Sequence, residues 1–146
     1  MKFWDSSALV PLLISQEFTK HSQLIWKQDS NPPLVWWESS LECLSALARL
    51  ERDQSIATVT FDAACAALKQ LSEVWHEIQP TNILRDRAHR LLRVHPLRAA
   101  DAQQLAAALI ASEDLSAQVT FVCFDQRLSQ SARREGFRVV DQQTKT

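Results

Sequence analysis

Short apolar runs alternate along this chain with longer segments that carry apolar side chains at helical spacing. Strands are expected over residues 2–4, 34–37, 74–78, 119–124 and 138–140. Helices are expected from about Ser7, over 17–28, from Ser39, and over 60–71, 81–94, 101–112 and 126–135. Strands that alternate with helices indicate βαβ units. The predicted fold class is therefore α/β, a three-layer α/β/α sandwich around a mostly parallel sheet, in one domain over residues 1–146.

The helix that begins at Ser39 carries leucines at positions 41, 44 and 47, and we expect this leucine stripe to face the core. Glu42 lies away from the stripe, together with Arg49, as a solvent-facing acid would. The spacing from Ser39 to Glu42 also fits a capping box, in which the glutamate would bond a backbone N–H.

Gly136 is the only glycine of the sequence, and it follows the last predicted helix, where a left-handed cap is expected. Glycine-rich phosphate loops cannot form in such a chain. Rossmann cofactor sites and P-loop NTPases are therefore excluded.

Composition is ordinary for a globular protein, with 46% hydrophobic and 23% charged residues. No apolar run approaches the roughly 20 residues that span a bilayer, and the N-terminus, interrupted by Asp5, makes a poor signal peptide. We expect a cytoplasmic protein with no membrane partner. Cys43, Cys65 and Cys123 form no CxxC pair, so they are expected to be buried small side chains. The net charge of −1 means that any attraction to phosphates is local or carried by metal ions.

Four acids fall where the predicted strands and helices meet. Asp5 and Asp125 directly follow strands, Glu42 lies in the first turn of a helix, and Asp101 opens one. A parallel sheet brings such positions to one edge. Clustered carboxylates repel one another, and Mg²⁺ or Mn²⁺ relieves that repulsion. Each acid alone is equally well explained as a helix cap, since Asp5, Asp101 and Asp125 all precede helices.

Four segments resemble, in order, the segments of PIN-domain nucleases. They are MKFWDSSALV (1–10), SSLECLSALARL (39–50), LRAADAQQLAAAL (97–109) and FVCFDQRLSQSARREGFRVV (121–140). The resemblance runs from residue 1 to about 140, and its length and segment order are most similar to the VapC-like toxins of bacterial toxin–antitoxin pairs.

This resemblance implies a sheet of strand order 3-2-1-4-5 with an acidic pocket at its carboxyl edge. It implies that Asp5, Glu42, Asp101 and Asp125 are the catalytic, metal-binding acids, and that the Ser6 hydroxyl supports them by hydrogen bonding. It further implies an endoribonuclease that uses Mg²⁺, with Mn²⁺ as a substitute, to hydrolyse RNA through a metal-activated water. The implied partners are an RNA such as a tRNA, a cognate antitoxin and a second copy of the chain.

The sequence departs from the family pattern two residues before the last acid, where Cys123 replaces a hydroxyl side chain and weakens the support expected for Asp125. Arg98 and Arg127 flank two of the acids. They are candidates for holding the RNA backbone or for offsetting the local charge, beside the plainer interpretation of solvated surface arginines.

Two other functions stay open. A non-catalytic PIN-like domain would bind RNA or protein without cutting it. A phosphatase of the haloacid dehalogenase type also has an acid after its first strand, but that chemistry needs a second Asp where this chain has Ser7.

Overall fold

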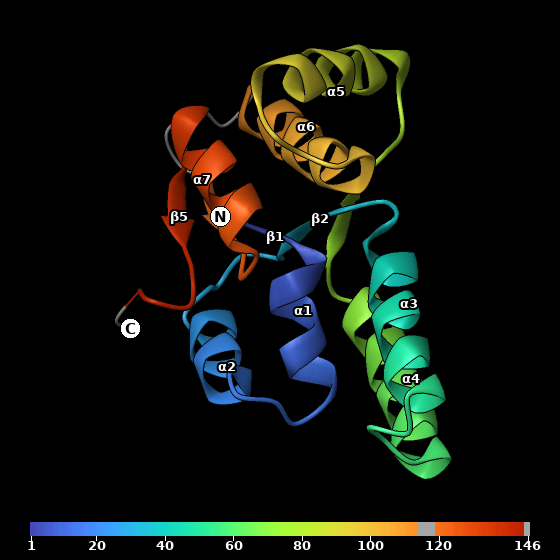
Figure 1. The fold of residues 1–146 in the computed structure, drawn as a ribbon. Helices are drawn as coiled ribbons and strands as arrows, with labels where there is room; N and C mark the ends of the chain where they lie inside the picture. Colours follow the sequence, from blue (N-terminus) through green and yellow to red (C-terminus); the bar gives the residue numbers. More distant parts are fainter. Residues whose placement is uncertain (114–118, 145–146) are drawn as a thin grey trace.

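The computed structural model describes residues 1–113 and 119–144, and a five-stranded sheet lies at its centre (Figure 1). The strands are β1 (Lys2–Trp4), β2 (Leu34–Trp36), β3 (His76–Ile78), β4 (Thr120–Val122) and β5 (Arg138–Val140). Every neighbouring pair is parallel, and the order is β3-β2-β1-β4-β5. The expected α/β class and the expected strand order are both confirmed.

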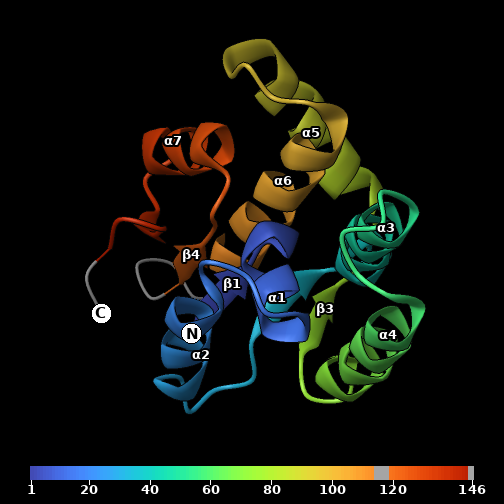
Figure 2. The ribbon, with the colours of Figure 1, turned by 60° about the horizontal axis from the view of Figure 1, so that its bottom comes forward.

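Helices cover both faces of the sheet (Figures 1 and 2). One layer contains α1 (Ser6–Leu13), α2 (Thr19–Lys27), α3 (Ser39–Arg52) and α4 (Thr58–Ser72). The other contains α5 (Asn82–Val94), α6 (Ala99–Glu113) and α7 (Gln126–Arg134). All seven helices expected from the sequence are present, with ends shifted by at most two residues. In the described ranges no helix is long and apolar enough to cross a membrane.

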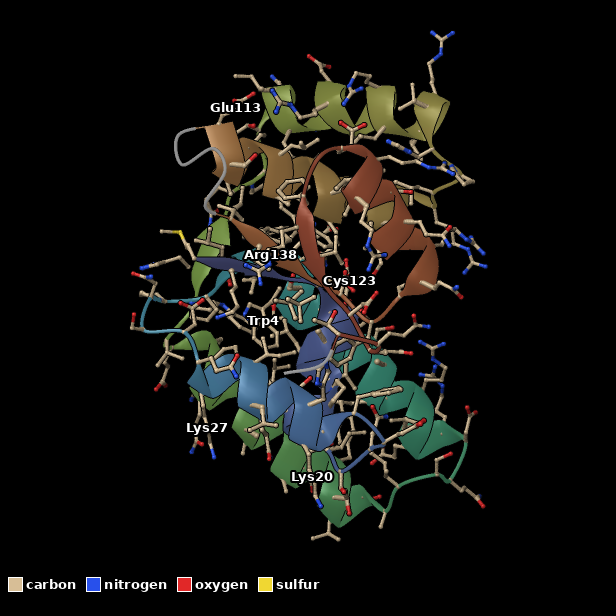
Figure 3. All side chains as sticks on the ribbon, turned by 90° about the vertical axis from the view of Figure 1, so that its left-hand side faces the viewer. Trp4, Lys20, Lys27, Glu113, Cys123 and Arg138 are labelled. Carbon is tan, nitrogen blue, oxygen red and sulfur yellow. The ribbon has the colours of Figure 1, made fainter. Side chains whose placement is uncertain are left out.

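The alternation of side chains along the strands divides the core into two layers. Phe3 pairs in register with Leu34 and Phe121, and all three pack against α5, α6 and α7. One residue further along β1, Trp4 enters the opposite layer and meets the ring of Trp26 edge-on, with centroids 5.1 Å apart (Figure 3). A shift of one residue in register would exchange the two layers, so burial on both faces holds the strands in place.

α7 ends just before the glycine that the sequence predicts as its left-handed cap. Gly136 has a φ of +92°, in the left-handed region that glycine adopts at low cost. Its N–H bonds the carbonyl of Arg133 at 3.0 Å, which satisfies one of the free carbonyls at the helix end. The predicted left-handed cap is confirmed.

The prediction that the leucine stripe on α3 faces the core is confirmed at Leu47 and wrong at the other two leucines. Leu41 is 64% exposed and Leu44 is 37% exposed, whereas Cys43 and Leu47 are fully buried. The helix is rotated so that its cysteine faces the core, because α3 packs against α1 and α4 through this side. The prediction followed the three leucines because their spacing is helical. A free cysteine, however, is among the side chains most often buried.

This rotation predicts unequal effects of two leucine substitutions on the same helix. Leu47→Ala is expected to lower the free energy of unfolding by about 2–5 kcal/mol, because it leaves a cavity in the core. Leu41→Ala is expected to change it by less than about 0.5 kcal/mol. Chemical denaturation of both variants measures the difference. Equal losses would contradict the assigned rotation of α3.

Candidate functional site

The carboxyl ends of all five parallel strands lie at one edge of the sheet. β1 is the central strand; the chain leaves it for β2 on one side and returns to β4 on the other. Ligands bind at such a switch point in open α/β sheets. Asp5 directly follows β1, and Asp125 follows β4 after two further residues. The fold thus brings together two acids that are far apart in the sequence.

A cavity of about 540 Å³ opens at this edge. All four acids selected from the sequence line it: Asp5, Glu42, Asp101 and Asp125. Glu38 lines it as a fifth acid. Glu38 occupies the N-cap position of α3 but makes no side-chain cap hydrogen bond.

Each of the four acids lies at the N-terminal end of a different helix. Asp5 caps α1 by accepting the N–H of Ser7 at 3.0 Å, and Asp125 caps α7 by accepting that of Leu128 at 2.8 Å. The two caps predicted at these positions are confirmed. Asp101 does not open its helix as expected, because α6 begins two residues earlier. Helix N-termini carry partial positive charge, so these positions favour ionised carboxylates.

Glu42 is neither a solvent-facing acid nor part of a capping box. Its Oε2 atom accepts hydrogen bonds from the Ser6 hydroxyl at 2.7 Å and from the Gln104 amide at 2.9 Å. Gln104 is only 1% exposed and also bonds the hydroxyl of Ser39 at 3.3 Å. Ser6 thus hydrogen-bonds one of the four acids, as the resemblance implied. The sequence did not identify Gln104 as part of the site. Its only signal in the sequence was a pair of glutamines, Gln103 and Gln104, in a helix otherwise rich in alanine.

Ser7 is a second residue that the sequence analysis did not assign to the site. Its hydroxyl donates to Asp5 Oδ2 and accepts the backbone N–H groups of Phe124 at 2.9 Å and Asp125 at 3.2 Å. One donor and two acceptors are the full capacity of a hydroxyl. Ser7 therefore connects Asp5, which follows β1, to the turn that follows β4. These three hydrogen bonds use the full capacity of its hydroxyl.

Cys123 lies beside Ser7 and Asp5 and is fully buried, directly after β4 (Figure 3). Its Sγ atom is 3.6 Å from Asp5 Oδ2 and 3.4 Å from the carbonyl oxygen of Asp125. Burial raises the pKa of the thiol well above its usual value, which keeps it protonated. The orientation of Asp125 depends on Ser7 and on the helix cap, so the replacement of a hydroxyl by this thiol leaves Asp125 held in place.

Burial and the nearby negative charges raise the pKa values of Asp5, Glu42 and Asp101. Burial is the largest influence on Asp5, and with the nearby charges of Glu42 and Asp101 it raises the pKa to about 6, against the opposing hydrogen bonds from Ser7. The pKa of Glu42 is raised mainly by burial, and its Oε1 atom is buried without a hydrogen-bond partner. The pKa of Asp101 is raised by burial and by Asp125. A bound cation would lower all three.

The donor set suits a hard, hydrated divalent ion. Within residues 1–113 and 119–144, no three His, Cys, Asp or Glu side chains already stand close enough together to enclose a metal ion. Mg²⁺, however, keeps several of its waters and binds through only one or two carboxylates. An unpartnered buried oxygen on Glu42 and acids that raise one another's pKa fit such an ion.

The arginines near the site divide into two groups. Arg98 and Arg127 are exposed and do not line the cavity. Both lower the pKa of Asp101, which agrees with the sequence prediction that they offset the local charge. Arg49 does line the cavity, where the sequence had placed it beside Glu42 on a solvent-facing side. It is the one basic side chain among the described residues that line this cavity.

Neither models of known protein families nor curated protein sequences give a match to this chain.

The raised pKa of Asp5 predicts a pH-dependent loss of stability. The pKa rises from 3.8 to about 6 on folding, so the folded state binds this proton more tightly than the unfolded chain. Stability from this group is complete below pH 4 and declines as the pH rises to 6. Asp5→Asn cannot ionise. The free energy of unfolding of Asp5→Asn minus that of the unsubstituted chain is therefore expected to be about 2 kcal/mol larger at pH 7 than at pH 4.5, which means that the variant gains relative stability as the pH rises.

Denaturation at both pH values in the presence of a chelator measures this difference. Asp62→Asn, which replaces an exposed acid on α4, is the matched control and is expected to follow the unsubstituted chain. A constant offset between Asp5→Asn and the unsubstituted chain across this range would contradict the assigned pKa of Asp5.

Proposed function

We propose that this chain is a Mg²⁺- or Mn²⁺-dependent endoribonuclease of the PIN type. One observation carries the proposal. The four acids of the four PIN-like segments, spread from residue 5 to residue 125, line a single cavity at the switch point of a sheet with order 3-2-1-4-5. Helix capping explains Asp5 and Asp125 singly, but it does not explain why Glu42 and Asp101 share their cavity.

In this proposal Asp5, Glu42, Asp101 and Asp125 hold the metal ion or ions. Their carboxylate oxygens are the ligands that Mg²⁺ and Mn²⁺ prefer. When bound, the metal supplies Lewis acidity toward water and the phosphodiester.

The protein's own groups orient these ligands. Ser6 and Gln104 fix Glu42 through one oxygen and leave Oε1 available, and Ser7 fixes Asp5 relative to the turn that carries Asp125. Arg49 lies on the cavity wall and would neutralise a phosphate of the RNA. Such groups raise rates by holding reactants in position.

RNA as the substrate, and the partners, follow from the resemblance. We extend the proposal to a toxin that cuts a structured RNA such as a tRNA, is held inactive by an antitoxin, and forms a homodimer through helices of its N-terminal half. An adjoining reading frame for a small DNA-binding protein and a dimer mass by light scattering are the expected observations. A strictly monomeric chain would remove the homodimer from the proposal.

The nuclease proposal predicts loss of cleavage in two acid variants. Asp5→Asn and Asp101→Asn each remove a negatively charged ligand while keeping the side-chain shape, and each is expected to lower the cleavage rate by at least about 100-fold. The measurement is cleavage of a labelled structured RNA with Mg²⁺ or Mn²⁺. Chelation of the metal is expected to abolish the activity of the unsubstituted chain.

Asp62→Asn, outside the cavity, serves as the control and is expected to cleave normally. Cleavage at the unsubstituted rate by a protein carrying both cavity substitutions would show that the site is assigned wrongly. RNA binding without cleavage at any metal concentration would favour the non-catalytic PIN-like domain.

A further inference from the structure

A second and larger cavity adjoins the acidic one. It has a volume of about 620 Å³ and lies at the carboxyl ends of β2 and β3, between the start of α3 and helices α5 and α6. Glu38 lines both cavities. Consecutive residues of α6 continue the boundary, since Ala99 lines the second cavity and Ala100 the acidic one. A ligand in the acidic cavity could therefore extend into the second one without crossing the protein core.

Trp37 forms an aromatic wall of this second cavity. Both tryptophans at 36 and 37 were expected in one strand, but β2 ends at Trp36, which is 2% exposed and belongs to the core. The Trp37 backbone N–H bonds the carbonyl of Ile78 at 3.2 Å, yet 47% of the residue is exposed. A fixed main chain with an exposed indole presents a flat apolar face to a ligand.

The remaining lining is mixed, with apolar side chains such as Leu84 and Leu92 beside several polar ones. Asn82 and Gln103 supply amides that both donate and accept hydrogen bonds, and Arg85 and His89 project from α5. Glu38 is the only acid in this lining, and its Oε2 atom accepts the indole N–H of Trp36 at 3.4 Å. Amides, a cation and an aromatic face are the groups that bind nucleobases.

The charge distribution favours a polyanion on this side. Residues 81–138 contain nine arginines against six carboxylates, whereas residues 1–80 contain six basic side chains against ten carboxylates. The net charge of −1 conceals this separation. Of the four arginines on α5, Arg85 lines the second cavity, whereas Arg87 and Arg90 form ion pairs with Glu113 and Glu135. A positive charge at Arg85 attracts a phosphate of the RNA backbone.

We propose that the second cavity binds an unpaired nucleobase of a single-stranded RNA segment, stacked on Trp37, whose neighbouring phosphodiester lies in the acidic cavity. The proposal rests on the nuclease function proposed above and adds the structural class of its substrate. The volume is within the range of small-ligand pockets. A base within a duplex is stacked and paired, so it cannot enter; cleavage is thereby directed to loops and unpaired ends.

Binding of RNA to Trp37 variants tests the proposal. The probe is a labelled, unstructured RNA of about ten nucleotides, bound in the presence of Mn²⁺ to proteins that also carry Asp101→Asn, which prevents cleavage. Trp37→Ala is expected to weaken binding about tenfold, the loss typical of one base–aromatic stack. Trp37→Phe is expected to keep most of the affinity. Leu24→Ala, which shortens a side chain 50% exposed on α2, is the control and is expected to have no effect.

A second probe separates base binding from phosphate binding. An RNA of the same length without bases keeps every phosphate, and it is expected to bind about tenfold more weakly than the intact RNA. Trp37→Ala is expected to cause no further loss with this probe. Trp37→Leu keeps an apolar side chain without an aromatic face, and it carries the test if the alanine variant does not fold.

Equal affinity of the Trp37 variants for intact RNA would overturn the base pocket. If Trp37→Ala instead converts a dimer to a monomer and leaves RNA affinity unchanged, the cavity is an interface with a second copy and the proposal is wrong. These outcomes are distinct from failure of the nuclease proposal, which would show as no metal-dependent cleavage by the unsubstituted chain.

Discussion

The Asp5 carboxylate lies at the end of the central strand, 4% exposed, where water cannot stabilise its charge. Its burial raises the pKa to about 6 although Ser7 and the start of α1 both favour the anion. Glu42 and Asp101 add repulsion. An ionised cluster of this kind lowers the stability of the fold unless a cation binds to it. Destabilising groups of this kind are concentrated at functional sites.

The parallel sheet is what creates this crowding. Because all strands end at one edge, the helices that follow them begin there, and their N-termini attract carboxylates. The proposed metal binding would use the same acids that cap helices, so capping and metal binding do not compete as explanations. Ser7 connects the two sides of the switch point, and Gln104 connects α6 to α3 through Glu42. The same edge continues into the second cavity, which Trp37 and Arg85 line together with Glu38.

Apolar runs and helical periodicity were sufficient to predict the strands and the helices, because burial on both faces dictates those patterns locally. The four acids were found through their place at strand ends and through the ordered resemblance. Periodicity failed in part for α3, where Cys43 and Leu47 face the core and Leu41 and Leu44 do not, because packing against α1 and α4 decides the rotation. Ser7 and Gln104 could not be predicted, since their partners lie 117 and 62 residues away in the sequence.

Calorimetric titration of the unsubstituted chain with Mn²⁺ near pH 6 tests the central claim most directly. A cation that joins the acids must displace protons from Asp5 and its neighbours, so saturable binding with proton release is expected. The heat and the released protons should both be lost in Asp5→Asn and retained in Asp62→Asn. A silent titration at millimolar Mn²⁺ would contradict the metal site and, with it, the proposed nuclease.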